Sequence, residues 1–181
     1  NKEVKIHSPE DAIKAGMGLI PEDRKSQGCF LNNTIEWNIS IGNIRELTTN
    51  RIVNKKKIRK QAEKYEEMLS IKTPSLTQKV GNLSGGNQQK VVLAKVLAAN
   101  TDIIIFDEPT RGIDIGARHE IYTMMSQLVE QGKSILMVSS DMEELIGMSD
   151  RIIILSEGKM SGMLNKNEFR QEKIMNFASP K

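Results

Sequence analysis

Short apolar runs alternate along the chain with longer stretches in which apolar residues recur every three or four positions. Runs rich in β-branched residues and bounded by polar or turn-forming residues predict buried strands. The predicted strands are residues 17–20, 103–107 and 134–139, together with a hairpin over 151–164 that turns at Glu157-Gly158. Because long helical stretches separate these strands, we expect a mostly parallel sheet of the α/β class, with helices on both faces.

Helical periodicity occupies most of the remaining chain. The first predicted helix begins at Ser8, a polar capping residue followed by Pro9. A polar loop is predicted over 22–28, after Pro21. The other predicted helical stretches cover 34–72, 86–99, 114–131, 141–148 and 166–178.

The stretch after residue 33 interrupts the alternation of strands and helices. An apolar stripe at Ile58, Ala62, Tyr65 and Leu69 has helical spacing. We therefore expect an inserted all-helical subdomain over 34–75. Core segments 1–33 and 76–181 would flank it within one domain.

Composition indicates an ordinary globular protein. Of the 181 residues, 27% are charged and 38% are hydrophobic, and the net charge of +3 is too small to argue for nucleic acid by itself. The longest apolar runs, such as Ile103–Phe106, are far too short to span a membrane, and the N-terminus lacks the apolar core of a signal peptide. The single cysteine, Cys29, fits a reducing cytosol, and we expect it to be inert.

The strongest chemical signal is the sequence IIIFDEPT, in which an apolar strand ends in two adjacent carboxylates, Asp107 and Glu108. Folds that transfer phosphate hold Mg²⁺ and polarise water with such residues. Asp107 would hold the metal, directly or through water, and Glu108 would orient or deprotonate the attacking water. The structural alternative is a strand that ends in two solvated acids before a proline turn.

The sequence GNLSGGNQQK places a serine and bare backbone at the start of a predicted helix. The first N–H groups of a helix lack intrahelical partners, and the helix dipole favours an anion there. We name Ser84, Gly85, Gly86 and Asn87 the glycine turn. Glycine is suited to a close approach between backbone and phosphate. The structural alternative is a capping serine followed by a tight turn.

Two segments resemble a phosphate-binding loop of the G-x-x-x-x-G-K-[ST] type, and neither fits. In the first, Asn87 and Gln88 stand where Lys and Ser or Thr are required. The second, Gly132–Ser134, lacks the first glycine, because Gln127 stands there, and it precedes a strand instead of a helix. The 181 residues therefore contain no such loop.

Four segments occur in an order that resembles the ATP-binding cassette (ABC) ATPases. They are PEDR at 21–24, LSGGNQQK at 83–90, FDEPT-RGID at 106–114 and SSD at 139–141. The chain is most similar to the second cassette of bacterial monosaccharide importers of the ribose and galactose type, from about residue 3 to residue 178. The resemblance implies a fold like that of the phosphate-loop NTPases, with the first strands and the phosphate loop missing.

The resemblance also implies roles for individual residues. The glycine turn would be the signature that contacts the γ-phosphate of ATP bound on an opposing cassette. Asp107 and Glu108 would be the Walker B pair, and Asp114 would lie in the D-loop. Glu22 occupies the place of a glutamine that senses the metal and faces the membrane subunit. Residues 34–75 would grip the coupling helix of that subunit.

The chain departs from the family pattern in three places. Ser140 stands near the position of the switch histidine, and neither His7 nor His119 is placed to serve. A serine can donate a hydrogen bond to phosphate but cannot act as a cationic clamp. Glu22 would add negative charge beside the metal. We expect this domain's own site to hydrolyse ATP slowly or mainly to hold nucleotide, and we expect the Walker A loop to precede Asn1.

The resemblance implies a peripheral ATPase on the cytoplasmic face of the membrane, with ATP and Mg²⁺ as cofactors. Its expected partners are a second cassette in the same full-length chain, membrane permease subunits and, indirectly, a sugar-binding protein, with no nucleic acid. One alternative is a soluble cassette ATPase that acts on ribosomes or DNA. Another is a non-catalytic cassette that only completes its partner's site. The chain alone would bind MgATP weakly, because the phosphate loop supplies most nucleotide contacts.

Solvent exposure or core packing, without a role in binding, explains three further groups of residues. The basic run Arg51–Lys64 contains seven Lys or Arg and one acid, and we interpret it as a solvated helix face with only Tyr65 available for stacking. Packing inside the helical subdomain and the core accounts for the remaining apolar groups. These are Trp37 with Ile35, Ile39 and Ile41, and Met124 and Met125 with Leu128.

Overall fold

The structure is a computed structural model that describes residues 3–179. The outermost residues of the first and last expected segments lie outside the described part. The chain divides into two compact units, one that ends at Val138 and one that begins at Ser139. Each unit is described separately.

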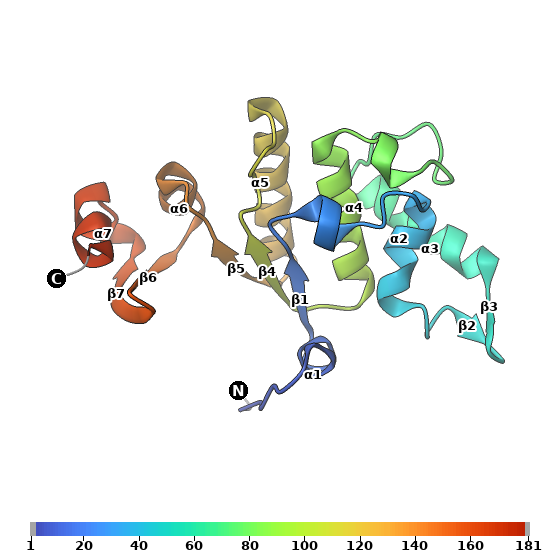
Figure 1. Ribbon diagram of the computed structural model, residues 1–181, viewed down its shortest axis with the longest axis horizontal. Coiled ribbons are helices and arrows are strands. Elements are labelled where there is room, and N and C mark those ends of the chain that lie inside the picture. The colour runs from blue at the N-terminus through green and yellow to red at the C-terminus, as the bar shows by residue number, and fades with distance from the viewer. Residues whose placement is uncertain (1–2, 180–181) are drawn as a thin grey trace. The chain divides into compact units, whose positions relative to one another are not determined.

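The first unit is built on a three-stranded parallel sheet (Figure 1). Its strands are β1 (Met17–Ile20), β4 (Ile103–Asp107) and β5 (Ser134–Val138), in the order β1-β4-β5. Both pairings are parallel and in regular register, with Leu19 opposite Ile105 and Ile105 opposite Leu136. The predicted strands and the α/β class are confirmed.

Helix α4 (Gly85–Ala98) packs against one face of this sheet, and α5 (Ile115–Glu130) contacts both α4 and β5. Ile104 and Phe106 of β4 are buried on the covered face. Gly18 lies so close to α4 that an added Cβ would sit 2.4 Å from a methyl carbon of Val96. The bounds expected for these two helices are correct to within one residue at each end.

Within the first unit, no described segment covers the opposite face of the sheet. Leu19 of β1 and Leu136 and Val138 of β5 are each about half exposed. Within the first unit, the helices that were expected on both faces are found on one face only. Strand periodicity shows that a residue is apolar, but it cannot show which segment covers it.

The expected all-helical insertion contains strands. Helix α2 (Ile35–Ser40) continues into a 3₁₀ turn, and α3 spans Lys55–Met68. Between them, β2 (Thr48–Thr49) and β3 (Ile52–Val53) pair as an antiparallel hairpin. The helical prediction is wrong here because β-branched residues favour strands and the two turn residues, Asn50 and Arg51, both have positive φ.

Two smaller predictions also need correction. The predicted loop over 22–28 contains a π-helix, Arg24–Gly28, capped by the Asp23 carboxylate. Cys29 N–H donates to the Arg24 carbonyl at 2.8 Å, which is the five-residue spacing of this helix type. The predicted helix over 166–178 is a 3₁₀ turn (Lys166–Glu168) followed by α7 (Gln171–Ala178).

Helix α1 (Pro9–Lys14) begins as expected, because Ser8 Oγ accepts from the Asp11 N–H. Most of the other apolar residues named in the sequence analysis are buried by packing in the structure. Trp37 meets Phe30 edge-on, with ring centroids 4.9 Å apart. The remaining fully or largely buried members are Ile35, Ile39, Met124, Met125 and Leu128.

The second unit contains α6 (Met142–Met148), the hairpin of β6 (Arg151–Ser156) and β7 (Lys159–Asn165), and α7. The hairpin turns at Glu157-Gly158, as predicted, and both residues have positive φ. Its core is formed by Ile152, Ile154, Leu164 and Ile174. In neither unit does the described chain contain a helix long and apolar enough to cross a membrane.

Candidate functional site

Two acidic side chains leave the sheet at the carboxyl end of β4. Asp107 is the last residue of the strand and is half-buried, opposite Val138 of β5. Glu108 follows with φ +47°, a left-handed conformation that is rare for a non-glycine residue. Its N–H donates to the Val138 carbonyl at 2.9 Å. Strained backbone of this kind is often found at functional sites, and here it turns the chain sharply after the strand.

The glycine turn lies at the start of α4 and is open to solvent at its first residue. Ser84 is exposed, and Gly85, Gly86 and Asn87 are half-buried. Ser84 is the N-cap by position, yet its side chain makes no capping bond to the helix. Its Oγ accepts from Asn87 Nδ2 at 3.0 Å instead. The interpretation of Ser84 as a side-chain cap is therefore wrong, and α4 begins with N–H groups that the serine does not satisfy.

Asp114 lies beside the glycine turn. It is the exposed N-cap of α5, and its Oδ1 accepts from the Ala117 N–H at 3.0 Å. A Cβ added at Gly86 would sit 3.2 Å from Ala117 Cβ. The glycine turn and the first residues of α5 are thus in close contact within the first unit, where Ser84 and Asp114 are both exposed.

Glu22 forms an ion pair with Arg111, and both side chains are largely exposed. Arg111 N–H donates to the Glu108 carbonyl at 3.1 Å, so this pair joins the segment after β1 to the loop after the acid pair. The Arg111 guanidinium therefore offsets the negative charge of the Glu22 carboxylate.

Ser140 belongs to the second unit and is exposed, directly before the N-cap of α6. Asp141 caps that helix by accepting from Glu143 N–H at 3.0 Å and from Glu144 N–H at 3.2 Å. The adjacent Ser139 hydroxyl donates to the buried Glu144 carboxylate. Ser139 and Asp141 therefore have structural partners within their own unit.

A network of charged and amide groups holds the glycine turn from behind. Asn87 Oδ1 accepts from the Lys72 N–H at 2.8 Å. Lys90, two residues beyond the first turn of α4, is buried and its Nζ contacts Glu120 of α5 at 2.8 Å. It also donates to the Ser70 carbonyl at 3.1 Å. These contacts fix the start of α4 against α5 without covering Ser84.

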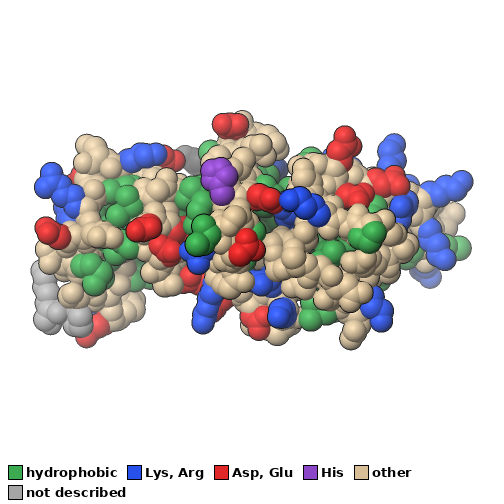
Figure 2. All heavy atoms as spheres, turned by 90° about the horizontal axis from the view of Figure 1, so that it is seen from above, with side chains coloured by type: hydrophobic (Ala, Val, Ile, Leu, Met, Phe, Trp, Pro, Cys, Tyr) green, Lys and Arg blue, Asp and Glu red, His purple; other side chains and the backbone are tan. Residues whose placement is uncertain are grey.

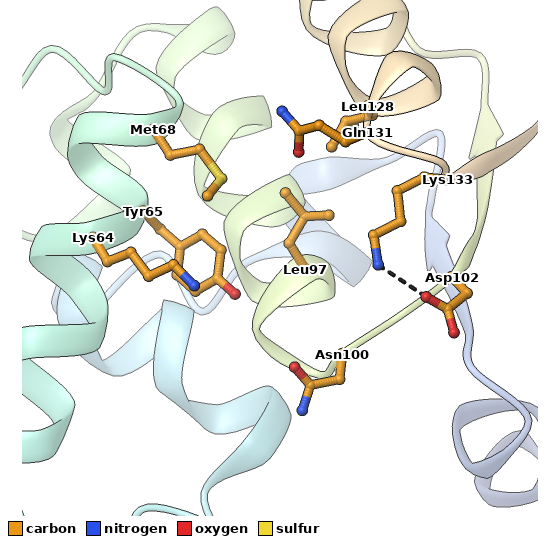
Figure 3. A pocket seen from close by; sticks show the side chains of 9 residues that line it. All are labelled: Lys64, Tyr65, Met68, Leu97, Asn100, Asp102, Leu128, Gln131 and Lys133. Atoms are coloured by element: carbon orange, nitrogen blue, oxygen red, sulfur yellow. Dashed lines mark hydrogen bonds and ion pairs between the residues drawn. The ribbon is translucent and has the colours of Figure 1, made fainter.

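One hollow in the described surface lies away from these residues (Figure 3). Its volume is about 430 Å³, and it lies between α3, α4 and α5 near the amino ends of β4 and β5. Lys133 and Asp102 form an ion pair of 2.9 Å at one side. The lining residues are Lys64, Tyr65, Met68, Leu97, Asn100, Asp102, Leu128, Gln131 and Lys133. None of the predicted site residues is among them.

The basic run retains its solvated character in the structure. Figure 2 shows Lys and Arg side chains gathered at the end of the first unit that carries β2, β3 and α3. Arg59 pairs with Glu36 and Glu63. Tyr65 is only 7% exposed, so its ring is not available for stacking on a base.

Cys29 is buried, and burial raises the pKa of its thiol to about 11. A thiol with this pKa is overwhelmingly protonated at neutral pH and reacts slowly. The expectation that this cysteine is inert agrees with its surroundings.

One residue of this region was not identified from the sequence. Arg24 Nη1 and Nη2 donate to the carbonyls of Arg111 and Gly112 at 3.2 and 3.4 Å. A Cβ at Gly85 would sit 2.7 Å from Arg24 Nη2. The only sequence signal was its place in PEDR, because its partners lie almost 90 positions away.

Several solved ATP-binding cassettes have this fold. A cassette of an ABC transporter in its ADP conformation superposes with a TM-score of 0.77 at 21% identity, over 98% of this chain and 73% of that one. The protein cbiO1 of Clostridium perfringens, part of the ABC transporter complex cbiONQ, gives a TM-score of 0.71 at 23% identity, over 93% of this chain and 65% of that one. At these identities the comparison shows the fold alone.

Curated relatives are more similar in sequence. The ribose import ATP-binding protein of Clostridium tetani is 46% identical over 98% of this chain and 35% of its own length. The xylose import ATP-binding protein of Moorella thermoacetica is 47% identical over 98% of this chain and 35% of its own length. The chain thus spans about a third of the length of these relatives.

A family model gives the membership directly. The model described as "ABC transporter" matches residues 2–111, which include the glycine turn and the acid pair. This match covers more than half of the chain and shows that the chain belongs to the ABC transporter family.

Proposed function

We propose that this chain is part of the ATP-hydrolysing subunit of a sugar importer, in which it presents the glycine turn to ATP held by a second cassette. One observation carries the proposal: Ser84 and the start of α4 are accessible, and no side chain of the turn caps the helix. An exposed helix start with unsatisfied N–H groups suits a phosphate. Relatives named ribose and xylose import ATP-binding proteins support a monosaccharide as the transported solute.

The roles proposed for the glycine turn are those that the family resemblance implies, and its exposure at the start of α4 is compatible with them. The Ser84 hydroxyl and the N–H groups of Gly85, Gly86 and Asn87 would donate to the γ-phosphate. Asp114, at the adjacent start of α5, would face the same shared interface. The partner cassette would contribute a lysine and the metal from the other side, so that neutral donors suffice here.

The acid pair would serve nucleotide bound on this domain's own face. Among the described residues there is no cluster of three or more His, Cys, Asp or Glu that would hold a resident metal. Mg²⁺ typically takes one or two carboxylates and completes its shell with water and phosphate oxygens. Asp107 therefore fits Mg²⁺ that arrives with the triphosphate, and such a metal would neutralise phosphate charge. Glu108 would orient or deprotonate water, Glu22 would lie beside the metal, and Ser140 would donate to phosphate.

The expected location is the cytoplasmic face of the membrane, with permease subunits gripped by residues 34–75. The second cassette would belong to the same longer polypeptide, because the curated relatives are about three times as long as this chain. A sugar-binding protein would act through the permease. The phosphate loop for this domain's own site would lie outside the 181 residues.

The proposal is tested by Ser84→Asp in the full-length protein reconstituted with its permease. Aspartate caps helices as well as serine does and can still accept from Asn87. It places a negative charge against the expected γ-phosphate, so we expect sugar-stimulated ATP hydrolysis to fall at least about tenfold without a lower melting temperature. The matched control, Asn82→Asp, adds the same charge at an exposed position and should stay within about twofold. Equal activity of both variants would refute the proposed role.

A second candidate is a non-catalytic cassette that only completes its partner's site. The pairing of Glu22 with Arg111 favours it, since a paired carboxylate is less free to serve a metal. Glu108→Gln separates the two candidates. Unchanged turnover would support the non-catalytic role, and a large loss would support two working sites.

A further inference from the structure

We propose that Arg24 is a positioning residue that joins the glycine turn to the loop after the acid pair and so couples the two nucleotide sites of the assembled protein. The inference rests on the proposed function and adds a residue that the family resemblance does not assign. Three contacts of one guanidinium carry it.

The first contacts are with the loop that follows the acid pair. Arg24 Nη1 donates to the Arg111 carbonyl at 3.2 Å, and Nη2 donates to the Gly112 carbonyl at 3.4 Å. Two nitrogens of a planar fork thus hold two consecutive carbonyls, a geometry that a lysine ammonium cannot reproduce. Gly112 has φ +65°, so the loop is sharply bent where Arg24 holds it.

The third contact is with the glycine turn. An added Cβ at Gly85 would lie 2.7 Å from Arg24 Nη2, so the guanidinium fills the space that a side chain there would occupy. The absence of a side chain at Gly85 therefore has two consequences. It opens the backbone to a ligand, and it admits a cation directly beneath the first residues of α4.

Two features of Arg24 are locally unfavourable. A positive charge beside the first turn of a helix opposes the helix dipole. Arg24 Nε is also buried without a hydrogen-bond partner in the described structure. Local rules that a fold violates tend to mark functional positions, because a ligand or a moving part supplies the compensation. A triphosphate at the glycine turn would compensate the cation.

Arg24 belongs to the segment that directly follows β1. It follows Glu22 and Asp23 at the start of the π-helix, and Glu22 pairs with Arg111 of the same loop. The segment that follows β1 therefore contacts both the loop of this domain's acid pair and the turn that faces the partner's nucleotide. Movement at either site is transmitted through one side chain.

The test uses the full-length transporter and measures kcat and KM for ATP. We expect Arg24→Ala to lower kcat at least about tenfold with KM within threefold, because the turn is misplaced but the nucleotide is anchored elsewhere. Arg24→Lys should fail to restore kcat, and added methylguanidinium should restore at least a third of the loss in Arg24→Ala. Lys25→Ala removes the neighbouring exposed cation and is the control, expected within twofold of wild type.

Wild-type kcat in Arg24→Ala, or full activity in Arg24→Lys, would overturn the inference. A cycle of melting temperatures tests the contact without reference to ATP hydrolysis. Gly85→Ala should lower the melting temperature less in the Arg24→Ala background than in wild type, and equal losses would also overturn the inference. A wild-type protein that hydrolyses no ATP would instead refute the proposed function, and the cycle alone would then decide whether the contact exists.

Discussion

The Nζ atom of Lys90 lies 2.8 Å from Oε2 of Glu120, and this ion pair joins α4 to α5 directly behind the glycine turn. The lysine side chain is 5% exposed and the glutamate side chain is 45% exposed. Removing the glutamate charge would leave the Lys90 ammonium buried without its counter-ion, which is costly. Because the Glu120 side chain is partly exposed, water would compensate for part of that cost. We therefore expect the pair to stabilise the packing of α4 against α5, and its contribution to the free energy of unfolding can be measured.

Glu120→Gln should destabilise the protein by about 1–2 kcal/mol, below the cost of breaking a fully buried pair because water reaches the glutamate. The measurement is urea unfolding at pH 7. Glu130→Gln is the control on the same helix, at an exposed residue, and should change stability by less than about 0.5 kcal/mol. Equal effects of the two variants would show that the pair contributes nothing.

The same pair predicts a pH dependence. The Lys90 ammonium, by hydrogen bond and by charge, holds the pKa of the Glu120 carboxyl below its ordinary value. A carboxylate with a lowered folded-state pKa stabilises the fold above its unfolded-state pKa, and this contribution is lost as pH falls through the folded-state pKa. The stability gap between wild type and Glu120→Gln should thus be complete near neutral pH and shrink below about pH 4. A gap that stays constant from pH 7 to pH 3 would contradict this account.

Gly18 should not tolerate a side chain. An added Cβ would lie 2.4 Å from a Val96 methyl carbon and 2.8 Å from Thr101 Cγ2, between β1 and α4. We expect Gly18→Ala to cost about 1–3 kcal/mol of unfolding free energy, as overpacked cores do. Gly147→Ala, at a helical glycine with no neighbour within 4 Å, is the control and should be neutral or slightly stabilising. A neutral Gly18→Ala would mean that α4 packs less closely on β1 than described.

The thiol of Cys29 should react only after unfolding. With its pKa raised to about 11 by burial, the thiolate population at pH 8 is about a hundredfold lower than that of an ordinary cysteine. A disulfide reagent such as Ellman's should label the native protein at least a hundredfold more slowly than the protein in urea. Stoichiometric labelling of native protein within a minute would contradict both the burial and the raised pKa.

Much of the fold and of the candidate site could be predicted from the sequence, because the patterns that specify them are local. The acid pair and the glycine turn are short contiguous patterns, and the strand before one and the helix after the other give each its position. Strand ends and helix starts of this kind are specified by nearby residues, so β4 and α4 occur within a residue of their predicted bounds.

The rest was not predictable, because it depends on distant contacts or on backbone conformation. The contacts of Arg24 cross almost 90 positions of sequence, and no periodicity reports them. The β2–β3 hairpin depends on left-handed conformations at Asn50 and Arg51, neither of which is a glycine. The open face of the sheet, marked by Leu19 and Leu136, has the same apolar pattern as a covered one.

The relative weight of the two nucleotide sites gives a further prediction. The glycine turn is accessible, whereas the site proposed for this domain's own nucleotide would use a serine, Ser140, where the resemblance implies a histidine, and Glu22, which pairs with Arg111. We therefore expect Ser84→Asp to lower sugar-stimulated turnover more than Glu108→Gln does, measured in the same reconstituted membranes. A larger loss in Glu108→Gln would mean that the acid pair of this domain carries most of the hydrolysis.

The shared pocket itself is tested most directly by hydrogen exchange of residues 81–90 in the full-length protein. The first N–H groups of α4 lack helical partners and should exchange fast without nucleotide. We predict that MgATP slows their exchange, and that this protection disappears when the phosphate-loop lysine of the partner cassette is replaced by alanine. Exchange that nucleotide leaves unchanged, or protection that survives loss of that lysine, would contradict a triphosphate held between the two cassettes.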